Sequence, residues 1–277
     1  MGYTSSYMSS VPPPEDPPQY QPFQQYYEPQ PPAPQPSPQR REGPLAQLGA
    51  LLLLILKGKT LLTLLISLGA YVWLLGSFWT ALGLVVMIFV HEMGHVVEIR
   101  RQGMKASAPL FIPFLGAAIF MRQHATDALK QAQIGIAGPI AGTIGATAAF
   151  VLYGSTHSNV LLSWALIGFF INLFNLLPFG MLDGGWIMGA VSKWFQVLGL
   201  IALAGAVYFL GLNFVAIVVI LFGIPTAIER FRNDQSPYYR SVPVRARLAM
   251  AAAWLFLTGY LAVATLAVNQ LVRPFVG

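Results

Sequence analysis

Apolar runs of membrane-spanning length recur along this chain, and they constrain its fold more than any other feature. A transmembrane helix needs about 20 consecutive apolar residues. Only 9% of the residues are charged, whereas a soluble domain carries about 25%. We therefore predict an all-α polytopic membrane protein with about six to seven transmembrane helices. The runs cover residues 60–76, 78–99, 133–153, 160–177, 197–228 and 248–271, and the break at Gly211 divides the run 197–228 into two helices.

The polar interlude between the second and third runs contains a stretch that is not helical in pattern. Residues 109–120 are apolar, interrupted by proline and β-branched at intervals. Non-helical backbone at membrane depth is tolerated only where protein or water covers it. We expect a small membrane-associated β segment near residues 105–122.

The remaining parts of the chain differ in composition. Residues 1–43 contain most of the 21 prolines together with many Gln and Tyr, which predicts a disordered tail. The tail either binds a partner in an extended conformation or has no specific role. The apolar run 45–56 is too short to span, so it re-enters the membrane or lies at its interface. This reading predicts three parts: the tail 1–43, a core 44–195 and additional transmembrane helices 196–277.

One apolar run contains the sequence His-Glu-Met-Gly-His, from His91 to His95. Residues four apart share a helix face, so the two imidazoles can bind one zinc ion. Glu92 can then take a proton from the attacking water, an arrangement typical of metalloproteases. Ionisable groups inside a membrane segment are costly and mark functional sites. The chain has no cysteine, so any further ligand must be His, Asp or Glu.

Asp183 is the best candidate for a third ligand, because a zinc site needs at least three protein ligands. It lies in apolar surroundings before Gly184 and Gly185, which allow the backbone to turn. The alternative is that Asp183 caps a short helix predicted at 186–195. Other acidic or imidazole side chains suit the site less well, because Glu98 lies about 10 Å along the helix from His91 and the rest lie in polar loops. The loop candidates are His124, Asp127 and His157.

Two further features have two interpretations each. The Asn175 amide either donates to an oxyanion in the substrate or holds the broken backbone near Pro178. Gly138 and Gly142 form a G-x-x-x-G pair, for which we favour close helix packing.

The His91-Glu-Met-Gly-His95 motif followed by Asn175-x-x-Pro178 and Leu-Asp183-Gly-Gly resembles the site-2 protease family of intramembrane zinc metalloproteases. The bacterial and archaeal members without a PDZ domain are the most similar in organisation. This resemblance implies His91, His95 and Asp183 as ligands of one zinc ion per chain and Glu92 as the catalytic base. It also implies cleavage of a transmembrane segment of a membrane-tethered protein, as in regulated intramembrane proteolysis.

Alternative functions and the partners follow from the same features. A catalytically inactive zinc-binding membrane scaffold is the second hypothesis. A metal transporter ranks third, because the spans offer few polar ligands along a path.

Basic residues cluster between spans, which favours an active site facing the cytoplasm, a cytoplasmic N-terminus and no nucleic-acid partner. The expected partners are a transmembrane substrate and the lipid bilayer.

Overall fold

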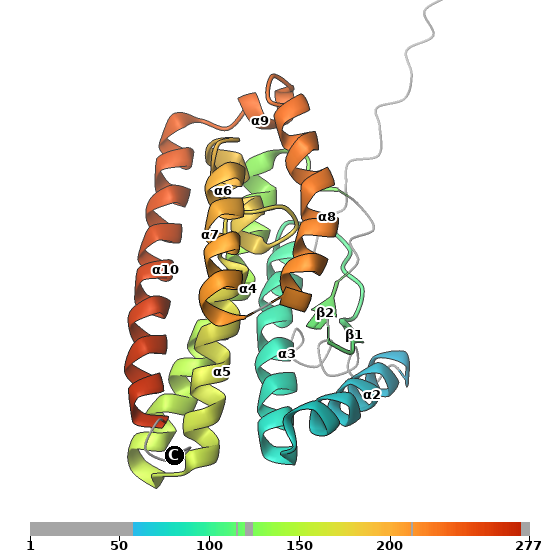
Figure 1. The fold of residues 1–277 in the computed structure, drawn as a ribbon. Coiled ribbons are helices and arrows are strands. Elements are labelled where there is room, and N and C mark those ends of the chain that lie inside the picture. Colours follow the sequence, from blue (N-terminus) through green and yellow to red (C-terminus); the bar gives the residue numbers. More distant parts are fainter. Residues whose placement is uncertain (1–57, 115, 120–123, 212, 273–277) are drawn as a thin grey trace, which may run out of the picture. The chain divides into compact units, whose positions relative to one another are not determined.

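A computed structural model describes residues 58–114, 116–119, 124–211 and 213–272 of the chain. The predicted disordered tail 1–43 and the short apolar run 45–56 lie outside these described residues. Figure 1 shows the elements in chain order. They are α2 (Gly58–Leu75), α3 (Phe78–Arg101), β1 (Leu110–Ile112), β2 (Gly116–Ala118), α4 (Ala128–Thr156), α5 (Asn159–Asn175), α6 (Asp183–Val191), α7 (Phe195–Leu210), α8 (Asn213–Arg232), α9 (Pro237–Arg240) and α10 (Val244–Val272).

The predicted all-α membrane architecture is confirmed. Within the described ranges, four helices are long and apolar enough to cross a bilayer, namely α2, α3, α4 and α10. The shorter apolar helices are α5 and residues 195–209. Large apolar side chains such as Trp73, Ile144 and Phe256 are exposed, as expected of surfaces that face lipid. The count of six to seven spans stays a prediction.

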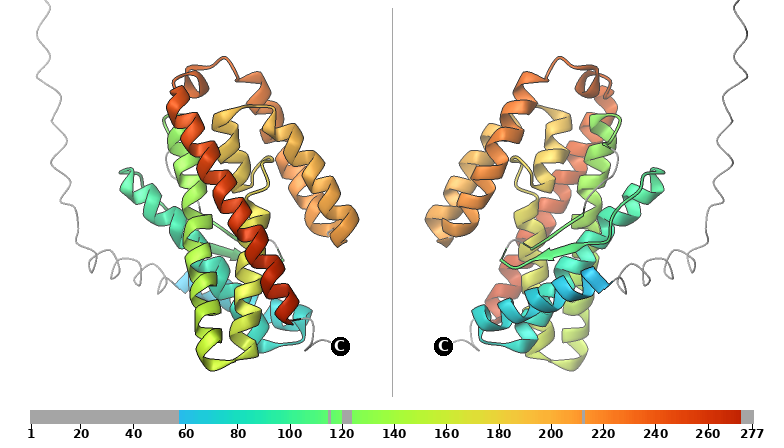
Figure 2. Two further views of the ribbon diagram at one scale, coloured as in Figure 1. Left: turned by 90° about the vertical axis from the view of Figure 1, so that its left-hand side faces the viewer. Right: turned by 90° about the vertical axis from the view of Figure 1, so that its right-hand side faces the viewer.

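Helices α3, α4 and α5 pack together to form the centre of the bundle. Glycines permit the close approach: a Cβ on Gly94 of α3 would lie 2.3 Å from the carbonyl oxygen of Ala137 on α4. A Cβ on Gly168 of α5 would lie 2.7 Å from Cβ of Ala146, also on α4. Helix α10 packs against α5 and α6 and runs along the flank of the bundle (Figures 1 and 2).

The predicted β segment is an antiparallel hairpin of β1 and β2, in which Phe111 pairs with Ala117. Gly116 has φ of +96°, a conformation that L side chains rarely adopt. The hairpin lies against α2 and α3, and the Phe111 N–H donates to Oγ1 of Thr63 on α2 at 3.3 Å. Phe111 is buried beside Phe89 of α3, so the β segment is anchored next to the helix that carries the histidines.

The run 197–228 forms two helices, as predicted. Helix α7 ends at Leu210 and is capped by Gly211, whose φ of +67° is the left-handed conformation common after a helix C-terminus. Helix α8 begins at Asn213. In Figure 2 the α7–α8 hairpin projects from the side of the bundle that carries α6.

Candidate metal centre

The two histidines of the motif lie one turn apart on the buried face of α3. Ser77 caps this helix by accepting a hydrogen bond from the Thr80 N–H, and the helix continues as an apolar segment to Arg101. His91 and His95 are only 3% and 7% exposed. Their Nε2 atoms lie 3.2 Å apart, so both imidazoles point at one place.

Asp183 reaches the same place from the start of α6. Its Oδ2 lies 3.0 Å from Nε2 of His91, and its Oδ1 lies 3.3 Å from Nε2 of His95. The following glycine allows α6 to start directly against the end of α5, because a Cβ on Gly184 would lie 2.1 Å from the Leu176 carbonyl oxygen. Because Gly184 has no Cβ, the backbone can approach the end of α5 closely enough for the Asp183 carboxylate to enter the bundle.

Helix α6 begins three residues earlier than the predicted segment 186–195, and this corrects the alternative role of Asp183. Leu182 occupies the N-cap position and makes no side-chain capping bond, while Asp183 is the first helical residue. The prediction that Asp183 caps the helix is therefore wrong. The glycines that resemble a turn signal in the sequence instead form the first turn of the helix.

Hydrogen bonds on the far side of each ring fix the orientation of the imidazoles. Nδ1 of His91 lies 2.8 Å from Oδ1 of Asn172, and the Asn172 amide N–H₂ donates to the Gly168 carbonyl at 2.6 Å. Nδ1 of His95 lies 2.8 Å from the Ile134 carbonyl oxygen. Because both partners are acceptors, each neutral imidazole carries its proton on Nδ1. Each Nε2 therefore presents a lone pair, the state that a metal ligand requires.

Three buried acceptors thus converge without a donor between them. One ligand atom from each of His91, His95 and Asp183 lies within 4.8 Å of the others. Within the described part of the chain, Asp183 Oδ2 has no hydrogen-bond partner. Acceptors at this separation repel, and a buried carboxylate without a cation is costly. A divalent cation would remove both costs, so these residues form a candidate metal site whose donor type and number fit zinc.

Helix α4 forms the wall opposite the imidazoles, at the two glycines of the G-x-x-x-G pair. A Cβ on Gly138 would lie 2.3 Å from Nε2 of His95, and one on Gly142 would lie 2.2 Å from Oδ1 of Asn172. The predicted close packing is present. The glycines make room for polar side chains of the site as well as for a neighbouring helix backbone.

Glu92, the candidate base, is partly buried on α3 next to His91. It interacts electrostatically with His91, His95 and Asp183. A carboxylate in this position lies close to the metal site without being one of its three ligands.

Among the described residues, the other acidic and histidine candidates are not members of this converging group. Glu98 is buried and accepts a hydrogen bond from Arg101 Nε at 2.7 Å. Asp127 caps α4 and His157 follows its last turn. The Asn175 amide donates to the Ile171 carbonyl at 3.1 Å, so one of its N–H groups is engaged within its own helix.

Asn172 is the residue that sequence reasoning missed. It lies on α5, is fully buried, and its amide contacts both His91 and the helix backbone. The available signal was a polar side chain within an apolar span, a placement that usually marks function.

The fold and the site define a helical membrane protein in which two histidines and one carboxylate form a buried candidate metal site. Two comparisons with known proteins agree with this class. The model of Peptidase family M50 matches residues 79–158. The zinc metalloprotease MJ0392 of Methanocaldococcus jannaschii is 27% identical over 155 residues, which cover 53% of this chain and 44% of the relative.

These two matches support the site-2 protease family, and the resemblance predicted from the motifs is confirmed. The aligned region is less than half of the relative's own length. The Peptidase family M50 match includes the two histidines of α3 and both glycines of α4, while Asp183 lies beyond it.

Proposed function

We propose that this protein is an intramembrane zinc metalloprotease, an endopeptidase that cleaves a transmembrane segment of a membrane-tethered protein. The observation that supports this proposal most is the convergence of His91, His95 and Asp183 beside Glu92 within a helical bundle. One zinc ion per chain would be held by Nε2 of each histidine and by the carboxylate of Asp183.

When bound, zinc would act as a Lewis acid that lowers the pKa of its bound water and polarises the carbonyl group of the substrate. Glu92 then acts as general base and takes one proton from the attacking water. The same carboxyl group delivers that proton to the leaving amine when the peptide bond breaks. Asn172 and the Ile134 carbonyl keep the two imidazoles oriented during both steps, because each accepts a hydrogen bond from an Nδ1–H. Asn175 is proposed to contact the substrate or its oxyanion with the amide N–H that its helix does not use.

The position of the site among apolar helices supports the proposed substrate class. A peptide bond inside a helix is protected by its own hydrogen bonds, so the substrate must unwind before it reaches the metal. The β1–β2 hairpin offers backbone groups with which an unwound strand can pair. Release of a membrane-tethered regulator is the biological outcome that the family resemblance suggests.

The orientation is part of the same proposal. Placing the Arg100 end of α3 in the cytoplasm puts most basic residues between spans on that side. In this orientation the N-terminus is cytoplasmic and the active site opens towards the cytoplasm. The tail is then available to a cytoplasmic partner.

Replacement of Glu92 by Gln tests the proposed reaction. Cells producing wild-type protein and cells producing Glu92→Gln are compared by mass spectrometry of membrane peptides. We expect new termini within transmembrane segments only with the wild type, while both purified proteins hold equal zinc. The matched control Glu229→Gln alters an exposed glutamate of α8 and should cleave normally.

The same experiment decides between the protease and an inactive zinc-binding scaffold. A scaffold would bind zinc in both forms and would produce no difference in membrane peptides. Full cleavage by Glu92→Gln would reject Glu92 as the base.

A further inference from the structure

Helix α6, which carries the proposed metal ligand Asp183, is short. It has nine residues, and its first residue is Asp183. Isolated helices of this length are unstable in water, so packing and hydrogen bonds from other elements must hold it in place. We propose that Gln196 is a positioning residue for Asp183, assisted by Arg230 and Arg247 at the other end of α6. This inference rests on the proposed zinc site.

The Gln196 side chain connects α7 to both ends of the turn that carries Asp183. Its Oε1 accepts a hydrogen bond from the Gly180 N–H at 2.7 Å, and its Nε2 donates to the Gly185 carbonyl at 3.1 Å. Gln196 is only 4% exposed, so water does not compete for these bonds. One planar amide thus fixes the separation of two backbone groups that lie on either side of the ligand.

The turn depends on this support because its own backbone is unusual. Gly180 has φ of +56°, and a Cβ there would lie 2.3 Å from Cα of Gly223 on α8. A Cβ on Gly185 would lie 2.5 Å from the Gly180 carbonyl oxygen. A chain with glycine at these positions has many alternative conformations, and the Gln196 amide selects one of them.

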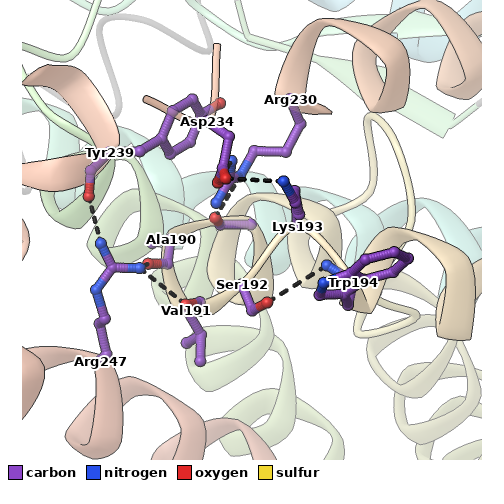
Figure 3. Close-up of polar contacts among 10 residues, drawn as sticks. Ala190, Val191, Ser192, Lys193, Trp194, Arg230, Asp234, Tyr239 and Arg247 are labelled. Atoms are coloured by element: carbon purple, nitrogen blue, oxygen red, sulfur yellow. Dashed lines mark hydrogen bonds and ion pairs between the residues drawn. The ribbon is translucent and has the colours of Figure 1, made fainter. Parts of the chain in front are cut away.

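Two arginines hold the opposite end of α6, as Figure 3 shows for Arg247 and its partners. Arg247 on α10 donates through one terminal guanidinium nitrogen to the carbonyls of Ala190 at 2.7 Å and Val191 at 2.8 Å. Arg230 on α8 donates through Nε to the Gly189 carbonyl at 2.7 Å. The last carbonyls of a helix lack intrahelical partners, and cations there also stabilise the helix dipole.

Arg230 is itself held in place. It is 4% exposed, its guanidinium lies 3.9 Å from the Tyr239 ring centroid, and one terminal nitrogen donates to Asp234 at 2.8 Å. Asp234 also pairs with Lys193, which follows α6, at 2.9 Å (Figure 3). The anchor for the C-terminal end of α6 is therefore a linked group of charged and aromatic side chains.

These contacts come from α7, α8 and α10, which contain no metal ligand. They hold in place the helix whose first residue is Asp183. They therefore determine where the Asp183 carboxylate lies relative to the two imidazoles. Residues that orient metal ligands typically change metal affinity by about 10–100-fold when they are removed.

The test measures zinc affinity of the full chain in detergent, by competition with a chelator of known affinity. Gln196→Leu keeps the side-chain size but removes both hydrogen bonds. We expect it to bind zinc about 10–100-fold more weakly than the wild type, with activity restored by excess zinc. Restoration by zinc distinguishes a misplaced ligand from a misfolded protein. The matched controls Arg232→Met and Arg245→Met remove exposed arginines at the ends of α8 and α10 and should leave the affinity unchanged.

Arg247→Lys provides a second comparison if Gln196→Leu lowers the folded yield. Lysine keeps the positive charge but cannot reproduce the planar set of donors that reaches several carbonyls, so weaker zinc binding is again expected. Wild-type affinity in both variants would overturn the inference while leaving the zinc site intact. Absence of zinc binding by the wild type would instead reject the proposed function, together with the inference that depends on it.

Discussion

Asn172 on α5 accepts a hydrogen bond from Nδ1 of His91 on α3 at a distance of 2.8 Å, across 81 residues of sequence. The same amide donates to the Gly168 carbonyl one turn earlier on its own helix. This pair of bonds leaves only one orientation for the amide and one tautomer for the neutral imidazole. The lone pair of His91 Nε2 therefore faces Asp183, and a metal ion can bind between them.

Replacement of Asn172 by Leu should weaken zinc binding by about 10–100-fold, because the His91 ring loses the partner that fixes its tautomer. Asn172→Asp keeps an acceptor at this position and should bind zinc more tightly than the Leu variant. Asn159→Leu changes an exposed residue at the start of the same helix and serves as the control. Equal zinc affinity of Asn172→Leu and the wild type, measured by chelator competition, would show that Asn172 does not orient the ligand.

Gly138→Ala should prevent metal binding, because the added methyl group would lie 2.3 Å from His95 Nε2. A zinc ion needs that space, since its bond to imidazole nitrogen is about 2.0–2.1 Å long. The clash should also lower the free energy of unfolding by about 1–3 kcal/mol.

The matched control for this substitution is on the same helix. A Cβ on Gly154 meets nothing within 4 Å, so Gly154→Ala should retain zinc and unfold at the wild-type temperature or higher. Metal content and thermal unfolding are measured for both variants. Normal zinc content in Gly138→Ala would mean that the metal lies elsewhere.

Removal of the metal should change the order of stability of the wild type and Asp183→Asn. Zinc at 100 times its dissociation constant stabilises a protein by about 2.7 kcal/mol, so chelation should lower the wild-type unfolding temperature. Without metal, the amide that this substitution introduces can donate to an imidazole nitrogen and relieve the repulsion between acceptors.

Asp183→Asn should therefore be at least as stable as the wild type after chelation, and less stable than the wild type when zinc is present. Thermal unfolding with and without chelator measures both comparisons. A variant that is less stable than the wild type under both conditions would contradict the acceptor arrangement.

The ion pairs of Asp234 predict a small dependence of stability on acid. Hydrogen bonds from Lys193 and Arg230 lower the pKa of the Asp234 carboxyl group. A carboxyl group with a lowered pKa in the folded state contributes stability above its unfolded pKa of about 3.9, and this contribution is lost as the pH falls through the folded pKa.

Asp234→Asn should therefore reduce stability at neutral pH and have no effect once the pH is below the folded pKa of Asp234. The effect should be modest, because water reaches this pair and screens it. Unfolding temperatures of both proteins between neutral pH and strong acid test this. If the difference in unfolding temperature between the two proteins did not change with pH, the loss of stability in Asp234→Asn would be due to packing and not to charge.

The sequence allowed the spans, the β segment and the histidine pair to be predicted, because each of these depends on local pattern. The apolar run around His91 determines both the helix and the face that carries His95. The break at Gly211 could likewise be identified from the run that it divides.

The support of the site could not be predicted in the same way. Asn172, Gln196 and Arg230 contact the site elements over long sequence separations, and nothing in their local sequence identifies their partners. The role of Gly138 was also hidden, since a G-x-x-x-G pair predicts close approach without saying which side chain approaches. The start of α6 was misplaced because the two glycines resemble a turn and are instead part of the helix.

The most direct test of the central claim is zinc K-edge X-ray absorption of the purified full-length protein, together with its metal content. We predict one zinc per chain, with two imidazole nitrogens at about 2.0–2.1 Å and carboxylate oxygen at about 2.0–2.2 Å. In Asp183→Asn the carboxylate contribution should disappear while both imidazoles remain. A zinc-free protein, or a spectrum without two imidazole ligands, would contradict the account.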